Sequence, residues 1–300
     1  MTTAAAFDAL RSTLDAHWQG LPDKPEETPE ATARALWFAA AGAPRSVIAA
    51  ADGTLPTLDD AAAGRLRALI ERRVAGEPLA HLTGRQRFMG LELLSEPGAL
   101  IPRVETEILA GETIAAARAA VAERGAVTVI DVCTGSGNVA LAVAAHVPEA
   151  RVHAADLSAD AVALARRNAA HLGLADRVTF AAGDLFAPIA ETGFTGQADV
   201  ISCNPPYISS ANVPKMAAEI SRHEPSLAFD GGAMGFTIIT RTFAEAPPLL
   251  RAGGTLCVEV GAGQGAFIAK RMARNETWSQ VRTADDAQGQ PRVVVAVKGQ

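Results

Sequence analysis

The sequence has few potential metal ligands. Its 300 residues include only three cysteines, Cys133, Cys203 and Cys257, which lie far apart and lack the paired spacing of a zinc site. The six histidines also show no metal-ligand spacing. We therefore expect no metal, and we interpret the cysteines as small residues of the hydrophobic core.

Long apolar runs and an excess of positive charge are missing as well. No apolar stretch is long enough to span a bilayer, and the first residues do not combine a basic segment with an apolar one. We therefore expect a cytoplasmic protein without membrane contact. The formal charge of −6 argues against binding nucleic acid by bulk neutralisation of phosphates, although it does not exclude a local basic patch. Direct nucleic-acid binding is not expected.

The first part of the chain, residues 1–83, has a helical pattern. Hydrophobic residues make up 49% of the whole sequence, which is enough for a sizeable core. We predict helices over residues 3–18, 29–42 and 58–76, and a short one that starts at Pro44. Pro29 suits the first position of its helix, and Thr28 suits the N-cap. Residues 84–103 then change to short apolar runs broken by glycine, which predicts a β-hairpin that links two domains.

The remainder, residues 104–300, alternates between strands and helices. Strands are predicted over 127–132, 151–155, 178–182, 198–203, 254–260 and 292–297, and helices over 138–146, 158–172, 212–220, 235–250 and 264–274. This alternation predicts an α/β domain with a mostly parallel sheet and helices on both faces. Such sheets bind ligands beyond the carboxyl ends of their strands.

A glycine loop follows the first of these strands. In the segment DVCTGSGN, residues 131–138, Gly135 and Gly137 allow a sharp turn and a close approach to a ligand at the N-terminus of the next helix. A single loop of this kind is a weak signal. The candidate cofactor-binding residues here are Asp131, Thr134, Gly135, Ser136, Gly137 and Asn138.

Carboxylates mark three successive strands and strengthen that signal. Asp131 lies in the first strand, Asp156 ends the second at the place where a ribose diol is held, and Asp184 follows the third. Asp131 would repel a pyrophosphate but suits a ligand that carries an ammonium and a sulfonium group, which favours S-adenosylmethionine over a dinucleotide. Asp184 is placed to accept a hydrogen bond from an adenine amino group, with Leu185 and Phe186 packed against the ring.

The fourth strand ends in Asn204-Pro205-Pro206-Tyr207, at the same edge of the sheet. An amino group on an sp² carbon is a poor nucleophile. The Asn204 side-chain oxygen and the Pro205 carbonyl can accept both of its N–H bonds, and Tyr207 can stack on a planar amide or base. We therefore take Asn204, Pro205 and Tyr207 as catalytic candidates, and these with Pro206 as the substrate-binding set. The motif alone does not separate adenine from glutamine.

These features together resemble the protein-(glutamine-N5) methyltransferases of the PrmC/HemK type, over nearly the whole chain. The segments that carry the resemblance are EPLAHLTGRQRFMG, ALIPRVETEIL, DVCTGSG, ADLS, GDLF, NPPYI, HEPSLAFDGG and GGTLCVEVGAGQ, in that order. The hairpin, the IPR segment and the EPSLAFDGG stretch are more specific to the glutamine enzymes than NPPY, which DNA adenine methyltransferases share.

The resemblance implies a Rossmann-like class I methyltransferase domain with S-adenosyl-L-methionine as cofactor. It implies cofactor contacts from residues 134–138, Asp156, Leu185 and Asn204, and glutamine contacts from residues 204–207. The substrate that it implies is the GGQ glutamine of peptide chain release factors. We expect the enzyme to be a monomer.

Four positions depart from the family pattern. Val104 replaces a proline and Leu185 a frequent tryptophan, and both changes are expected to alter packing only. Met234 and Pro291 each replace an aspartate, which bears on the identity of the protein substrate but not on the chemistry. Alternatives are a glutamine methyltransferase for a ribosomal protein or a small-molecule amide, a nucleic-acid adenine N6-methyltransferase, and a non-enzymatic binding module.

Several polar residues near the domain junction allow two interpretations. Arg103, with Glu105 and Glu107, forms either a capping and ion-pair cluster or part of the cofactor pocket. His223 and Glu224 either orient the substrate or cap a helix end. Phe88 is interpreted as a core residue.

Overall fold

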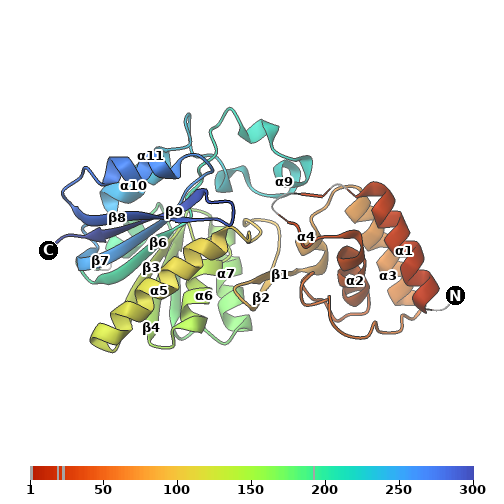
Figure 1. Cartoon of the computed structure of the whole chain (residues 1–300). Coiled ribbons are helices and arrows are strands. Elements are labelled where there is room, and N and C mark those ends of the chain that lie inside the picture. The colour runs from red at the N-terminus through yellow and green to blue at the C-terminus, as the bar shows by residue number, and fades with distance from the viewer. Residues whose placement is uncertain (1–2, 19, 22–23, 192) are drawn as a thin grey trace.

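The computed structural model describes residues 3–18, 20–21, 24–191 and 193–300. Within them, a helical domain lies at one end of the molecule (Figure 1) and comprises α1 (Thr3–His17), α2 (Pro29–Ala40), α3 (Asp60–Val74) and α4 (Leu79–Thr83). Thr28 caps α2 by accepting a hydrogen bond from the Ala31 N–H, as predicted. The helices enclose a hydrophobic core that includes Leu36 and Trp37.

A hairpin links the helical domain to the rest of the chain. Strands β1 (Arg85–Phe88) and β2 (Leu91–Leu94) pair antiparallel, which confirms the predicted hairpin. The Leu94 N–H donates to the Asn168 side-chain oxygen at 2.6 Å, so β2 is fixed to the larger domain. Phe88 is only 1% exposed and is a core residue.

The larger domain, called the sheet domain, is built on a seven-stranded sheet within the described residues. Its strands are β3 (Val127–Val132), β4 (Ala150–Asp156), β5 (Val178–Ala182), β6 (Ala198–Cys203), β7 (Leu250–Glu259), β8 (Trp278–Asp285) and β9 (Pro291–Lys298). The order is β5-β4-β3-β6-β7-β9-β8. The pairs from β5 to β7 are parallel, whereas β9 runs antiparallel to both β7 and β8. The predicted fold class is confirmed.

Helices cover both faces of this sheet (Figure 1). One face packs against α5 (Thr106–Arg124), α6 (Asn138–His146) and α7 (Ala159–His171), and the other against α8 (Ala187–Ala190), α10 (Thr237–Glu245) and α11 (Gly265–Met272). Successive residues of each strand point to opposite faces of the sheet, so the sheet has a hydrophobic core on each side. Val129 packs in the first core, on the side of α5, and Ile130 packs in the second core, on the side of α10.

The structure corrects several predicted elements. Residues 212–220 do not form one helix, because extended Met216 separates a 3₁₀ turn, η1 (Val213–Lys215), from the short α9 (Ala218–His223), which a second 3₁₀ turn, η2 (Ser226–Ala228), follows. The helix predicted from Pro44 is absent, and residues 47–50 form a turn instead. The helix predicted over 235–250 ends at Glu245, since Pro247 and Pro248 have no N–H to continue it. Helices α4, α5 and α8 and strand β8 were not predicted.

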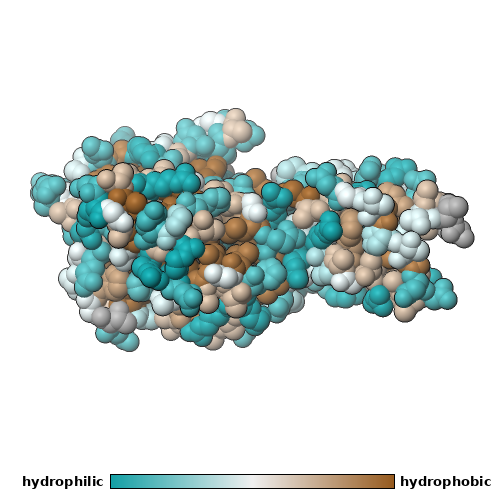
Figure 2. All heavy atoms as spheres, turned by 90° about the horizontal axis from the view of Figure 1, so that it is seen from below, coloured by the Kyte–Doolittle hydropathy of each residue, from teal (hydrophilic) through white to brown (hydrophobic). Residues whose placement is uncertain are grey.

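The face of the molecule seen from below is mostly hydrophilic (Figure 2). Seen from below in Figure 2, the two domains lie side by side, and apolar patches on the sheet domain are flanked by hydrophilic residues. None of the helices in the described ranges combines the length and apolarity needed to cross a membrane.

Candidate active site

The candidate site lies at the carboxyl ends of β3, β4 and β6. β4 pairs with one edge of β3 and β6 with the other, so the strand order switches direction between β3 and β6, and this is where doubly wound sheets open a crevice. Two adjoining cavities occur here. The strand-end cavity is lined by, among others, Asp131, Thr134, Gly135, Asn138, Asp156, Asp184, Leu185, Asn204 and Pro206. The tyrosine cavity is lined by, among others, Glu105, Thr106, Asn204, Pro205, Tyr207 and Glu259.

The glycine loop forms one wall of the strand-end cavity. Gly135 has a φ of 55°, and its N–H donates to Asp156 Oδ2 at 2.8 Å, which joins the loop to the end of β4. Gly137 has a different function: a Cβ there would lie 3.1 Å from the Ala165 Cβ, so glycine allows α6 to pack closely on α7. Ser136 is buried beside it. Only part of the predicted loop set therefore lines the cavity.

Asp131 is a buried carboxylate at the base of this cavity. It is 1% exposed and accepts hydrogen bonds from Thr134 Oγ1 and Ser202 Oγ, both at 2.6 Å. Burial raises its pKa to about 6, and the two hydroxyl donors oppose that rise. Repulsion from the Asp156 carboxylate raises the pKa of Asp131 further. A cationic ligand would relieve this repulsion.

The end of β5 differs from the prediction in two details. Leu185 lines the strand-end cavity, as expected, but Phe186 is 3% exposed and packs in the second core instead of facing a ligand. Asp184 also lines the cavity, and its two oxygens accept hydrogen bonds from Arg241 at 2.9 and 3.0 Å. The sequence reasoning missed Arg241, which comes from α10 and fixes the Asp184 carboxylate.

The cysteines also require one correction. Cys203 and Cys257 are buried, as interpreted from the sequence. Cys133 is only partly buried, lines the strand-end cavity and has a φ of 56° in the left-handed region. It is therefore part of the cavity wall and not only a core residue.

Asn204 lines both cavities, and its neighbours divide between them. Pro206 borders the strand-end cavity, whereas Pro205 and Tyr207 border the tyrosine cavity. The Asn204 Nδ2 group donates to Thr106 Oγ1 at 3.2 Å, which leaves Oδ1 as the acceptor atom of the side chain. A group held at Asn204 would therefore meet a ligand of the strand-end cavity.

Glu259 connects the residues around the tyrosine cavity. It ends β7, is 2% exposed, and accepts a hydrogen bond from the Tyr207 hydroxyl at 3.1 Å. Burial raises its pKa to about 7, and hydrogen bonds from Thr106 and Tyr207 oppose the rise. Burial also raises the pKa of Tyr207, so this phenol stays a neutral donor. The sequence reasoning missed Glu259, although its place at a strand end was the signal that identified the other carboxylates.

The junction residues do not form one ion-pair cluster, because Arg103, Glu105 and Glu107 have different neighbours. Arg103 lines both cavities and also forms an ion pair with Glu224 at 2.5 Å. Glu107 lies apart from them and accepts a hydrogen bond from the Met89 N–H.

Among the departures from the family pattern, Val104 and Met234 are exposed. Pro291 packs against Gly265, where an added Cβ would lie 2.5 Å from that of Pro291.

Comparison with known proteins identifies the family. Residues 119–270 match the model of the methyltransferase small domain, and residues 19–84 match that of the PrmC N-terminal domain. A release factor glutamine methyltransferase of Moorella thermoacetica is 42% identical over 221 residues, which cover 72% of this chain and 73% of the relative. One from Bradyrhizobium diazoefficiens is 35% identical and covers 99% and 96%. The chain belongs to the release factor glutamine methyltransferase family.

Family membership confirms the enzyme class, an S-adenosylmethionine-dependent methyltransferase. A comparison with a solved structure supports the methyltransferase fold. The structure of a methyltransferase from Pyrococcus furiosus superposes with a TM-score of 0.50 at 18% identity and covers 78% of this chain and 98% of its own.

Asp156→Asn should weaken the binding of S-adenosylmethionine by about 10- to 100-fold, because a charged hydrogen-bond acceptor is lost from the cavity wall. Isothermal titration calorimetry measures this effect. Asp176→Asn, which changes an exposed carboxylate before β5, is the control and should bind normally. Equal affinities of the two variants would remove Asp156 from the binding site.

Proposed function

We propose that this protein transfers a methyl group from S-adenosylmethionine to the N5 amide nitrogen of the GGQ glutamine in peptide chain release factors. The observation that carries the proposal is the position of Asn204, which belongs to the walls of both cavities. One cavity suits the methyl donor and the other a planar amide. The names of the relatives support the choice of the protein substrate.

The strand-end cavity fits a cationic donor. Its lining includes Asp131, Asp156, Asp184 and Asp230 but only one basic side chain, Arg103. The sulfonium and ammonium groups of S-adenosylmethionine suit this charge balance, and the carboxylate of its methionine part suits Arg103. We propose that Gly135 and Asn138 contact the cofactor from the wall of this cavity, with Asp156 holding the ribose.

The residues of the tyrosine cavity would prepare the amide nitrogen for attack. S-adenosylmethionine, when bound, supplies an electrophilic methyl group. The lone pair of an amide nitrogen is delocalised, so its attack needs orientation and stabilisation of positive charge on nitrogen. The Asn204 Oδ1 and the Pro205 carbonyl would accept its two N–H bonds, while Tyr207 would stack on the amide plane. The methylated nitrogen is acidic and can release its proton to water.

We further propose that the enzyme acts as a cytoplasmic monomer without direct contact to nucleic acid. The net charge of −6 supports the last point, since phosphate binding requires a basic surface.

Methyl transfer from labelled S-adenosylmethionine tests the proposed function. The enzyme is incubated separately with release factors, ribosomal proteins and DNA, and the label is located by mass spectrometry. We expect label on the GGQ glutamine and none on a release factor in which alanine replaces that glutamine. Label on DNA or on a ribosomal protein instead would overturn the assignment.

A further inference from the structure

The segment of residues 208–235, which contains η1, α9 and η2, is here called the strap. At its base, the Ile208 and Ser210 N–H groups donate to the carbonyls of Phe229 and Gly232, so the two ends of the strap lie together. Between them, Glu224 is the only buried residue of segment 211–228. A segment with so little buried apolar surface depends on other contacts for its position.

The strap supplies walls to both cavities. Met216, Ile220 and Phe229 line the tyrosine cavity, and Pro225 and Leu227 line the strand-end cavity. Any displacement of the strap would therefore change the space around Asn204.

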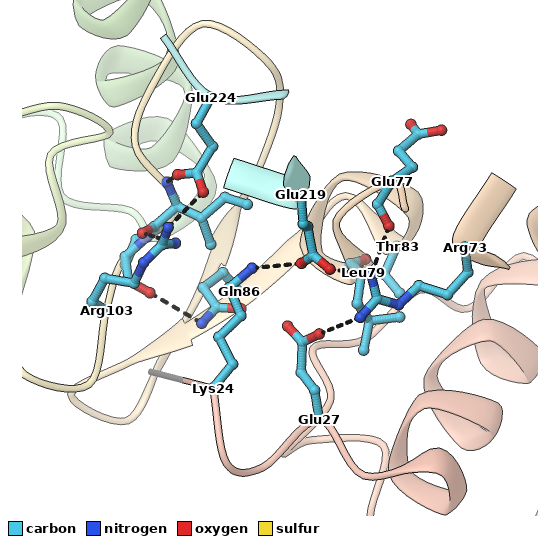
Figure 3. A network of polar contacts seen from close by, with 12 residues as sticks. Lys24, Glu27, Arg73, Glu77, Leu79, Thr83, Gln86, Arg103, Glu219 and Glu224 are labelled. Atoms are coloured by element: carbon cyan, nitrogen blue, oxygen red, sulfur yellow. Dashed lines mark hydrogen bonds and ion pairs between the residues drawn. The ribbon is translucent and has the colours of Figure 1, made fainter. Parts of the chain in front are cut away.

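Glu219 fixes the outer part of the strap to the helical domain. Its two oxygens bind Lys24 Nζ at 2.9 Å and Arg73 Nη1 at 2.6 Å, and Arg73 also binds Glu27 at 3.1 Å. Figure 3 shows Glu219 between the basic side chains, with Glu27 below. All four side chains are at most 12% exposed. Although burial alone would raise the pKa of Glu219, Lys24 and Arg73 hold it below its usual value, so the carboxylate is charged.

Glu224 fixes the strap to the hairpin side in the same way. Its oxygens accept hydrogen bonds from Arg103 at 2.5 Å and from the Ile101 N–H at 2.9 Å. In the described part of the chain, the ion pairs that join the strap to other segments end on Glu219 and Glu224. The residue after Glu219, Ile220, lies in the wall of the tyrosine cavity. One turn of α9 thus contacts both the helical domain and the acceptor side of the site.

We propose that Glu219 is a positioning residue, through which the helical domain holds the strap in place and sets the wall of the tyrosine cavity. This inference rests on the proposed function for its substrate, but it makes a separate statement: the helical domain contributes to turnover, and not only to the capture of the partner protein. Loss of the Glu219 carboxylate would leave Lys24 buried without its ion-pair partner and Arg73 with Glu27 alone, so it should release the strap.

Steady-state kinetics with an intact release factor test this proposal. Glu219→Gln should lower kcat by about tenfold, since small misplacements of a site are costly, whereas the affinity for S-adenosylmethionine stays within about twofold. Hydrogen exchange over residues 211–228 should become faster. Glu219→Asp, which keeps the charge, should restore part of the lost kcat.

Asp199→Asn is the matched control. Asp199 is also buried and paired with arginines, Arg124 and Arg251, but it lies at the opposite end of β6. It should lower stability without changing kcat or exchange in the strap. A higher KM with unchanged kcat in Glu219→Gln, or an equal loss of kcat in Asp199→Asn, would overturn the proposal. If the unaltered enzyme fails to methylate release factors, the proposed function fails, while hydrogen exchange still decides whether Glu219 holds the strap.

Discussion

Asn204→Ala should reduce kcat for release factor methylation by about 100- to 1,000-fold, the loss typical of a preorganised group that stabilises transition-state charge. The variant loses the side-chain oxygen that would accept an N–H bond of the target amide, and it also loses the donor to Thr106. Single-turnover rates with saturating cofactor measure the chemical step.

Cofactor binding separates this explanation from a general collapse of the site. The strand-end cavity keeps its carboxylates in Asn204→Ala, so calorimetry should give a dissociation constant within about threefold of that of the unaltered enzyme. Asn212→Ala, an exposed asparagine of the strap, is the control for asparagine loss. Normal turnover in Asn204→Ala would exclude Asn204 from the mechanism.

The central strands were predictable because buried parallel strands are short apolar runs that end in loops. Residues 127–132, 178–182 and 198–203 agree with β3, β5 and β6 at both ends. Helix α5 was missed because alanines occur on its exposed as well as its buried side, which obscures the apolar stripe. Strand β8 was missed because it is a half-exposed edge strand with mixed polarity.

The site was predictable where a single rule applied, namely that parallel strands end at one edge of the sheet. That rule placed Asp131, Asp156 and Asn204 together, and it also applies to Glu259, which the sequence reasoning overlooked. The strap contacts could not be predicted. Lys24 and Glu219 are separated by 195 positions, and nothing local in either segment indicates the other. Such pairs follow from how two domains pack.

Glu259→Gln should make the protein more stable than the unaltered enzyme above pH 7. The buried Glu259 carboxyl has a pKa of about 7, compared with 4.5 in its ordinary state. Between about pH 4.5 and pH 7, Glu259 keeps its proton in the folded protein but has lost it in the unfolded chain. The stability that protonated Glu259 contributes therefore falls as pH rises and is lost above about pH 7. The shift corresponds to about 3 kcal/mol in the free energy of unfolding.

Urea denaturation at pH 6.5 and 8 isolates this effect. Groups that titrate alike in both proteins cancel in the difference between them, so the change of this difference with pH reports Glu259, whose pKa is about 7. The advantage of Glu259→Gln over the unaltered enzyme should grow from pH 6.5 to pH 8. The exposed change Glu123→Gln is the control and should give no such trend. A constant difference between the two proteins would contradict a titrating Glu259.

Activity should change in the opposite direction. Ionised Glu259 is a stronger acceptor for the Tyr207 hydroxyl than the neutral acid, so ionisation should hold the Tyr207 ring more firmly beside Asn204. The kcat of the unaltered enzyme should therefore rise as pH increases through about 7. In Glu259→Gln the side chain stays uncharged at every pH and is a weaker acceptor for Tyr207, so kcat should be about tenfold lower and should lose this rise. A variant that is more stable but slower would show that the buried charge reduces stability in order to hold Tyr207 in place.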